Sequence, residues 1–209
     1  MEQLIATYLL NIGAVNLNPQ EPYTWTSGLK APIYCDNRLI ISHPDVRLEI
    51  AQAMVQVIKK QFPDVEVIAG TATAGIPHAA LVAHLLQLPM VYVRSSAKAH
   101  GTKSAIEGRL DKGSKVVMIE DLISTGKSVI QAANFVKAEG AEVLGCVAIF
   151  NYLLATGQQA FEQCQLPLYT LSNYRALIEV ATQQASLSQY KATLEKWYQD
   201  PVAWSEQVN

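Results

Sequence analysis

A regular alternation of short apolar runs and longer amphipathic stretches occupies the middle of this chain. Helical patterns cover residues 76–87 and 129–139, and apolar runs of strand length cover 65–69, 89–93, 116–119 and 143–150. Short runs rich in β-branched residues are typical of strands buried on both faces. Strands that alternate with helices predict an α/β fold, in which helices flank a central, mostly parallel sheet.

The segments on either side show mainly helical periodicity. A helix is predicted for residues 4–12, and a second begins at the start signal Ser42-His43-Pro44-Asp45 and runs to about residue 62. Residues 23–41 predict one or two short strands with a loop, and the tail from Tyr152 predicts helices with a strand at 168–171. No composition shift marks a second domain, so we expect one domain over residues 1–209 with an α/β core over 43–150.

Composition excludes several classes of protein. The chain has 16 basic and 18 acidic residues, a net charge of −2, which argues against a nucleic-acid surface. The longest apolar stretch, residues 79–93, is interrupted by polar residues and proline, and the N-terminus has no basic region, so neither a membrane span nor a signal peptide is predicted. We therefore expect a cytoplasmic protein without membrane or nucleic-acid partners. The absence of a C-x-x-C pair predicts free thiols at Cys35, Cys146 and Cys164.

The stretch Val116–Ser128, VVMIEDLISTGKS, combines a predicted strand, two acids, a small polar loop and the start of a helix. Amides at a helix N-terminus favour an anion by about 0.3–1 kcal/mol. Gly126 allows the backbone to approach a ligand closely, and the loop hydroxyls can donate to phosphate oxygens. Glu120 and Asp121 would repel phosphate, but they suit a neighbouring diol or a metal-bridged group. A ribose 5-phosphate satisfies both halves of the stretch.

An ordinary structural role is the alternative for this stretch. Acids after a buried strand often cap the next helix, and Ser-Thr-Gly is common in turns. The spacing of a Walker loop is absent, as is any Gly-x-Gly-x-x-Gly motif, so two common nucleotide-binding motifs are excluded. The same choice applies to Thr71–Gly75, which is either a second anion loop before a helix N-terminus or a plain strand-to-helix turn.

The stretch resembles the phosphoribosyl-pyrophosphate (PRPP) signature of the type I phosphoribosyltransferase family, which is a hydrophobic run, two acids and a small-residue loop. Three further stretches are similar to the orotate phosphoribosyltransferase branch of that family, namely YTWTSGLKAPIY, GTATAGIPHAA and RSSAKAHG. The match in order and spacing spans most of the chain. It implies the type I fold with a small N-terminal cap, or hood, formed by residues 1–42 and part of the C-terminal tail.

The resemblance also implies a reaction. Orotate and PRPP would give orotidine 5′-monophosphate and pyrophosphate, a step of pyrimidine biosynthesis, with Mg²⁺ as a cofactor that PRPP carries near Asp121. No nucleophilic side chain is required, because the family displaces pyrophosphate at the ribose anomeric carbon through a cation-like transition state. The resemblance further implies a homodimer in which lid residues serve the neighbouring subunit.

The family pattern distributes PRPP binding over three segments. The acids of the central stretch bind the ribose hydroxyls, its loop binds the 5′-phosphate, and the segment at Thr71 holds the pyrophosphate. The resemblance makes Lys98, His100 and Asp121 the catalytic residues. The full PRPP set is Thr71, Ala72, Thr73, Arg94, Lys98, His100, Glu120, Asp121, Leu122, Ile123, Ser124, Thr125, Gly126, Lys127 and Ser128.

Residues 94–109 hold five basic residues opposed by one acid, Glu107, and few apolar anchors. Such a stretch is either a solvated loop or a lid that closes on a charged phosphate, and the family has a lid at this place. Family members often carry a lysine directly after the arginine that matches Arg94. This chain has Ser95 there, so one basic contact is missing or replaced.

Orotate is a carboxylate, so its binding needs a cation or several amides. Ser124 matches a family position that contacts orotate. Many bacterial members have lysine where this chain has Thr26, and some branches have arginine where it has Asn151. Lys30 and Arg38 are therefore the candidates for the carboxylate, with a plain surface role as the alternative for both.

Two other functions stay open from the sequence. A purine or uracil phosphoribosyltransferase would share the PRPP residues and differ in the base that it accepts. A regulator that senses PRPP and binds nucleic acid would keep the fold, but it should show a strongly basic face or an added DNA-binding domain, and the sequence has neither.

Overall fold

The computed structural model describes residues 1–96 and 104–208, which divide into two compact units. The first unit comprises Met1–His43 and the residues from Ser172 onward, and the second comprises Pro44–Leu171. The second unit extends past residue 150, where we expected the α/β core to end, because a further helix and strand complete it.

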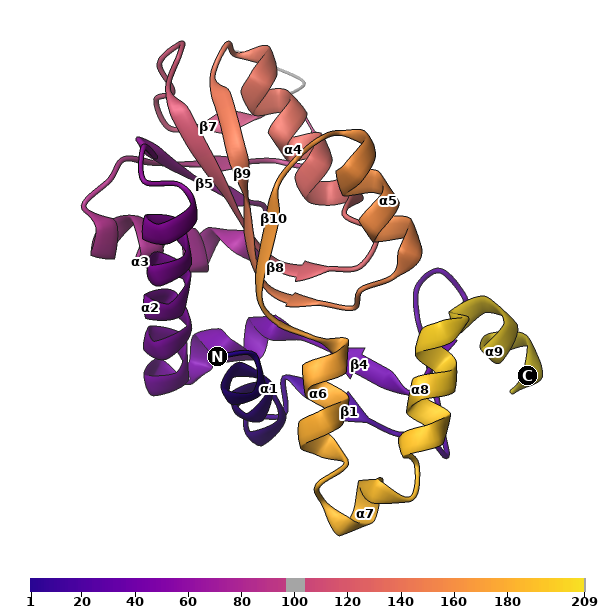
Figure 1. Cartoon of the computed structure of the whole chain (residues 1–209). Helices are drawn as coiled ribbons and strands as arrows, with labels where there is room; N and C mark the ends of the chain where they lie inside the picture. The colour runs from indigo at the N-terminus through magenta and orange to yellow at the C-terminus, as the bar shows by residue number, and fades with distance from the viewer. Residues whose placement is uncertain (97–103, 209) are drawn as a thin grey trace. The chain divides into compact units, whose positions relative to one another are not determined.

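The second unit is built from alternating helices and strands. Its elements are α2 (Pro44–Gln61), β5 (Val67–Thr71), α3 (Gly75–Leu86), β6 (Met90–Val93), β7 (Ile106–Glu107), β8 (Lys115–Ile123), α4 (Lys127–Ala138), β9 (Glu142–Asn151), α5 (Ala155–Gln163) and β10 (Leu168–Asn173). In the described chain these strands form a six-stranded sheet in the order β10-β9-β8-β5-β6-β7 (Figure 1). β5 pairs in parallel with β6 and β8, and β8 in parallel with β9, whereas β7 is antiparallel to β6. The predicted α/β fold with a mostly parallel sheet is confirmed.

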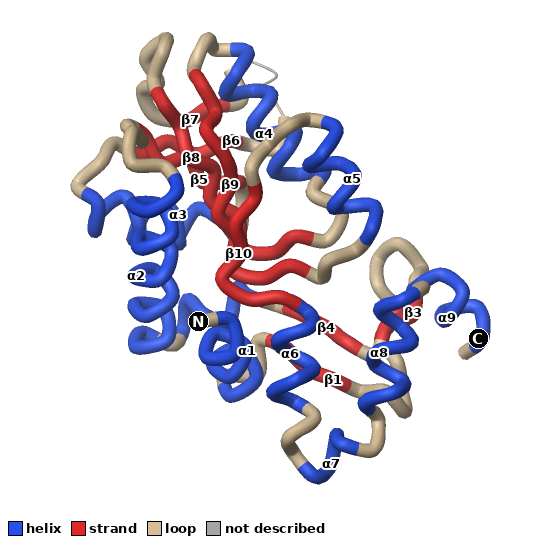
Figure 2. Tube along the Cα trace, viewed as in Figure 1, coloured by secondary structure: helices blue, strands red, loops and turns tan. Residues whose placement is uncertain are grey.

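Helices cover both faces of this sheet, with α2 and α3 on one side and α4 and α5 on the other (Figure 2). All five residues of β5 are buried, as are Val116–Glu120 of β8. Strands buried on both faces have no solvent side to alternate with, which explains the continuous apolar runs in the sequence. Val116 and Met118 of β8 pack in one core with Val129 and Val136 of α4.

The two central strands run further than the apolar runs predicted. β5 ends at Thr71 rather than at residue 69, and β8 ends at Ile123 rather than at residue 119. The pairing of β8 with β9 continues through Glu120 and Ile123. Ladder hydrogen bonds come from the backbone, so polar side chains do not end a strand. Both acids of the central stretch therefore lie inside β8 rather than after it.

The first unit joins segments from both ends of the chain. Its elements are α1 (Glu2–Asn11), β1 (Val15–Leu17), β2 (Tyr23–Thr24), β3 (Lys30–Ala31), β4 (Ile33–Cys35), the 3-10 helix η1 (Asn37–Ser42), α6 (Tyr174–Ala181), α7 (Ala185–Ser188), α8 (Lys191–Gln199) and α9 (Pro201–Gln207). β1 pairs antiparallel with β4, and β2 with β3. α1 packs on α6, and the Gln3 amide donates to the Glu179 carboxylate at 3.0 Å.

The three cysteines are free thiols, as predicted. Cys146 is fully buried in β9, and burial together with the neighbouring Glu120 carboxylate raises the pKa of its thiol well above the usual range. No helix within the described ranges combines the length and the apolar character needed to cross a membrane.

His78 is buried in α3 with 1% of its surface exposed, and neither ring nitrogen has a hydrogen-bond partner among the described residues. Burial, assisted by the positive charge of Arg47, lowers the pKa of His78 to about 4. The folded protein therefore keeps this imidazole neutral at pH values where an exposed histidine is already charged.

His78 should make the protein less stable as the pH falls from about 6.5 to about 4. In this window the unfolded chain binds a proton at His78 and the folded chain does not, so acid favours unfolding by up to about 3 kcal/mol. His78→Leu should flatten the pH dependence of the free energy of unfolding, measured in urea at about pH 7 and about pH 4.5. His84→Leu, at an exposed position of the same helix, is the control. Equal slopes in wild type and His78→Leu would contradict this account.

Candidate active site

The adjacent acids of β8 occupy different environments. Glu120 is buried with 6% exposure, whereas Asp121 is half-buried and points to the opposite face of the sheet. The Asp121 amide donates to Glu120 Oε1 at 3.1 Å. Burial, followed by the negative charge of Asp121, raises the pKa of Glu120 well above its usual range. Asp121 is therefore the acid of the pair that lies nearer to solvent.

A tight loop carries the chain from β8 into α4. Gly126 precedes the helix with φ +74°, a left-handed conformation that glycine adopts without strain. A Cβ at Gly126 would lie 2.6 Å from Phe161 Cε2. The helix begins at Lys127, so its first amides lack intrahelical partners and point towards the loop. Three of the other predicted PRPP residues in this stretch are half-buried, namely Leu122, Ser124 and Thr125. Two are exposed, Lys127 and Ser128.

α5 packs against this loop. A Cβ at Gly157 of α5 would collide with the carbonyl oxygen of Ser124, so only glycine allows the helix to pack this closely. The Tyr152 amide donates to the carbonyl of Ile123 at 3.0 Å, which fixes the last residue of β8. Packing against α5 and this hydrogen bond thus support the loop at both of these residues.

The second predicted anion loop follows the neighbouring strand. The pairing of Gly70 with Ile119 makes Thr71 and Glu120 the next residues along adjacent strands. Thr71 is 3% exposed, and no residue within 1–96 and 104–208 forms a well-aligned hydrogen bond with its hydroxyl. The hydroxyl still lies near enough to Glu120 to oppose part of the rise in the pKa of that carboxyl. A ligand or an ordered water would complete the hydrogen bonding of this oxygen. The peptide bond from Ala72 to Thr73 is cis.

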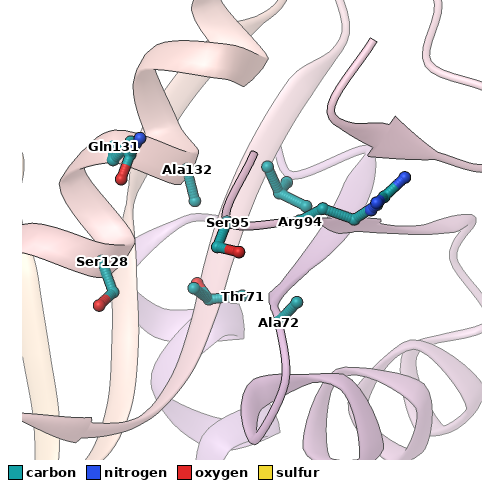
Figure 3. Close-up of a pocket in the computed structure, with 8 residues that line it drawn as sticks. Thr71, Ala72, Arg94, Ser95, Ser128, Gln131 and Ala132 are labelled. Carbon is teal, nitrogen blue, oxygen red and sulfur yellow. The ribbon is translucent and has the colours of Figure 1, made fainter. Parts of the chain in front are cut away.

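A pocket lies between α4 and the ends of β5 and β6 (Figure 3). Its walls bring together four predicted PRPP residues, Thr71, Ala72, Arg94 and Ser128. It also includes three residues that the sequence argument missed, Val93, Gln131 and Ala132, and Ser95, which stands where family members often carry a lysine. Gln131 and Ala132 lie three and four positions after Ser128, so helical periodicity alone places them on the same face of α4.

Arg94 lines the pocket, and a neighbouring carboxylate balances part of its positive charge. Its Nη1 lies 3.7 Å from Glu107 Oε1, and in Figure 3 the side chain extends away from Thr71. The Arg94 amide donates to the Ala105 carbonyl at 2.9 Å, and β7 continues this pairing with β6. The expectation that residues 94–109 form one irregular loop is therefore wrong at its C-terminal end, because β7 satisfies its backbone there by joining the sheet.

The candidates for the orotate carboxylate differ in their partners. Arg38 forms a two-point ion pair with Asp36, with Nε–Oδ1 at 2.6 Å and Nη2–Oδ2 at 2.8 Å, and this pair lowers the pKa of Asp36. The Lys30 ammonium donates to the Val208 carbonyl at 3.1 Å. Both cations belong to the first unit and Ser124 belongs to the second.

Lys98 and His100, two of the predicted catalytic residues, lie outside the described residues. Within residues 1–96 and 104–208, no group of three or more His, Cys, Asp or Glu side chains is arranged to hold a metal ion.

Comparison with known proteins supports a single family. The family model described as a phosphoribosyl transferase domain matches residues 40–165. The orotate phosphoribosyltransferase of Enterococcus faecalis is 55% identical over 203 residues and covers 97% of both chains. That of Listeria innocua is 53% identical over 207 residues and covers 99% of both chains. The crystal structure of orotate phosphoribosyltransferase from Aeropyrum pernix is similar in fold, with a TM-score of 0.77 at 24% identity over 87% of this chain and 99% of that chain.

Glu107 should compete with an anionic ligand for Arg94. Removing its charge in Glu107→Gln should tighten the binding of pyrophosphate with Mg²⁺ by about two- to fivefold, since exposed ion pairs contribute about 0.2–1 kcal/mol. Calorimetry measures this affinity. The control is Asp111→Asn, which breaks the exposed pair with Arg109 in the same stretch and should leave the affinity unchanged. Weaker binding in Glu107→Gln would mean that Glu107 orients Arg94 rather than occupying it.

Proposed function

The chain belongs to the orotate phosphoribosyltransferase family, and we propose from this premise how its residues carry out the transfer. Its reaction is the transfer of the ribose 5-phosphate group of PRPP to orotate. The bond from the anomeric carbon to pyrophosphate breaks, and pyrophosphate leaves with the electron pair. A ring nitrogen of orotate forms the new bond and loses its proton to water, giving orotidine 5′-monophosphate.

One observation supports PRPP as a ligand of this site. Thr71 and Glu120 continue adjacent parallel strands, and both strands lead into helix N-termini through small-residue loops. Two anion loops on either side of acceptor carboxylates match a ligand with two phosphate ends and a diol between them.

Roles then follow from exposure and charge. Asp121, which is half-buried, accepts hydrogen bonds from the ribose hydroxyls. Glu120, buried and with a raised pKa, acts mainly by orienting Asp121 through the backbone amide between them. The loop Ser124–Ser128 holds the 5′-phosphate with its hydroxyls and amides, and Leu122 and Ile123 contribute only backbone.

The pyrophosphate end is held by Thr71, Ala72 and Thr73. Neutralising the leaving group requires cations, which we assign to Arg94, Lys98 and His100. Asp121 would hold the Mg²⁺ that PRPP carries, and that ion would supply further charge neutralisation to the departing pyrophosphate. No nucleophilic side chain is assigned, because positioning and charge stabilisation supply the catalysis.

For orotate, we assign Ser124 to the ring and Lys30 or Arg38 to the carboxylate. A buried polar group built to pair one substrate group rejects ligands that lack it by up to about 10⁴–10⁵ in kcat/KM. The protein should therefore use orotate at least about a thousandfold better than uracil, adenine or hypoxanthine in an assay of pyrophosphate release. Comparable turnover of uracil would contradict the assignment of orotate and would indicate a phosphoribosyltransferase that accepts several bases.

The protein is proposed to act as a homodimer in which Lys98 and His100 serve the neighbouring subunit. Twofold symmetry makes each subunit both donor and recipient. Lys98→Ala and Asp121→Asn should each be nearly inactive alone. After mixing and subunit exchange, half of the dimers are mixed and each of these has one intact site, so about a quarter of wild-type activity should return.

Native mass spectrometry of the two variants is the control for exchange in this experiment. Exchange without recovered activity would show that Lys98 acts within its own chain. The proposed sharing of the site would then be wrong, while the PRPP assignment would stand.

A further inference from the structure

Lys30 lies in the short β2–β3 hairpin, opposite Thr24. The turn is closed by its own backbone, since the Trp25 amide donates to the Leu29 carbonyl at 2.9 Å and the Gly28 amide to the Trp25 carbonyl at 2.8 Å. A two-stranded hairpin is at best marginally stable in water. The position of Lys30 therefore depends on what packs against the hairpin.

Both backbone polar groups of Lys30 bind side chains of the C-terminal helices. Its amide donates to Ser205 Oγ of α9 at 2.9 Å, and its carbonyl accepts from Trp197 Nε1 of α8 at 3.3 Å. Trp197 is 0% exposed and Ser205 is 6% exposed. These side chains occupy the hydrogen-bonding edge of β3 that a further strand would otherwise cover.

Aromatic packing reinforces the contact. The Trp25 and Trp197 rings meet edge to face, with centroids 5.7 Å apart and planes at 75°. Trp197 also packs on Tyr174 with centroids 4.9 Å apart. The Trp25 indole donates to the Ile33 carbonyl at 3.0 Å. The hairpin is thus anchored on a buried tryptophan at both its backbone and its side chains.

The Lys30 side chain is held more weakly than its backbone. Its ammonium donates to the Val208 carbonyl, which carries no charge, and no carboxylate of the described residues forms an ion pair with it. Arg38, by contrast, would have to break a two-point pair with Asp36 before it bound another carboxylate. Of the two candidate cations, Lys30 exchanges its partner for a ligand carboxylate at the lower cost.

We propose that α8 and α9 form a clamp that positions Lys30 for the carboxylate of orotate, with Trp197 and Ser205 as positioning residues. This inference rests on the proposed function, because it selects Lys30 from the two cations assigned there. With its amide and carbonyl fixed, only the side-chain torsions of Lys30 remain to be ordered when the ligand binds. Trp197 and Ser205 act through Lys30 and do not touch substrate.

Two variants remove the clamp contacts, Ser205→Ala with little change in packing and Trp197→Phe with a cavity beside Trp25 and Tyr174. Ser205→Ala removes the acceptor for the Lys30 amide, and Trp197→Phe removes the indole donor while keeping an aromatic ring. Each should raise KM for orotate about three- to tenfold and leave kcat and KM for PRPP within about twofold. Ser205→Thr, which keeps the hydroxyl, should behave as wild type. Ser188→Ala in α7, whose hydroxyl donates to the Ala185 carbonyl, is the matched control.

A double-mutant cycle separates positioning from plain stability. Lys30→Met alone should raise KM for orotate about ten- to a hundredfold. On that background, Ser205→Ala should have no further effect on KM, because its effect passes through Lys30. The melting temperature of every variant is measured alongside.

The outcomes distinguish the two levels of the proposal. An unchanged KM for orotate in Lys30→Met removes Lys30 from the site, and the proposed clamp is then wrong as well. The clamp is overturned, and the role of Lys30 stays intact, if Lys30→Met raises KM but the clamp variants change only the melting temperature. The same holds if the effect of the clamp variants on KM adds to that of Lys30→Met.

Discussion

The parallel pairing of β5 with β8 is the constraint on which the rest of the site depends. It places Gly70 opposite Ile119, so the next residues, Thr71 and Glu120, continue adjacent strands. A slip of one residue would turn every side chain of β8 to the other face. The register of this strand pair thus decides which acid of β8 continues the strand beside Thr71.

Close approach between helices and strands then fixes the two anion loops. A Cβ at Gly75 would lie 2.5 Å from the Ile119 carbonyl oxygen, so this glycine lets α3 begin directly against β8. Gly157 plays the matching part for α5, which packs on the carbonyl of Ser124. Loops that lie on such a rigid scaffold bind without a large ordering cost.

The candidate cations of the two units differ in how firmly their internal partners hold them. Arg94 lies 3.7 Å from the Glu107 carboxylate, and Lys30 donates to an uncharged carbonyl, so each has a partner that it can release. Arg38 is held in an ion pair with Asp36 by two short hydrogen bonds. The sequence shows only that all three residues are cations, so the difference in how firmly each is held appears only in such distances.

The sequence by itself determined the α/β class and most of the sheet-forming segments, because strand-length apolar runs and helical periodicity follow directly from which faces are buried. It predicted strand-to-helix connections near Thr73 and near Ser124, but the structure places Thr71 at the end of β5 and Ser128 in the first turn of α4. It could not show that Glu120 is buried and Asp121 half-buried, because that depends on register and on backbone pairing that continues past the apolar run. It also missed β7, two residues long, and the Trp197 and Ser205 contacts to Lys30, which join residues 167 and 175 positions apart. Local patterns carry no information about such contacts, and only the tertiary structure decided them.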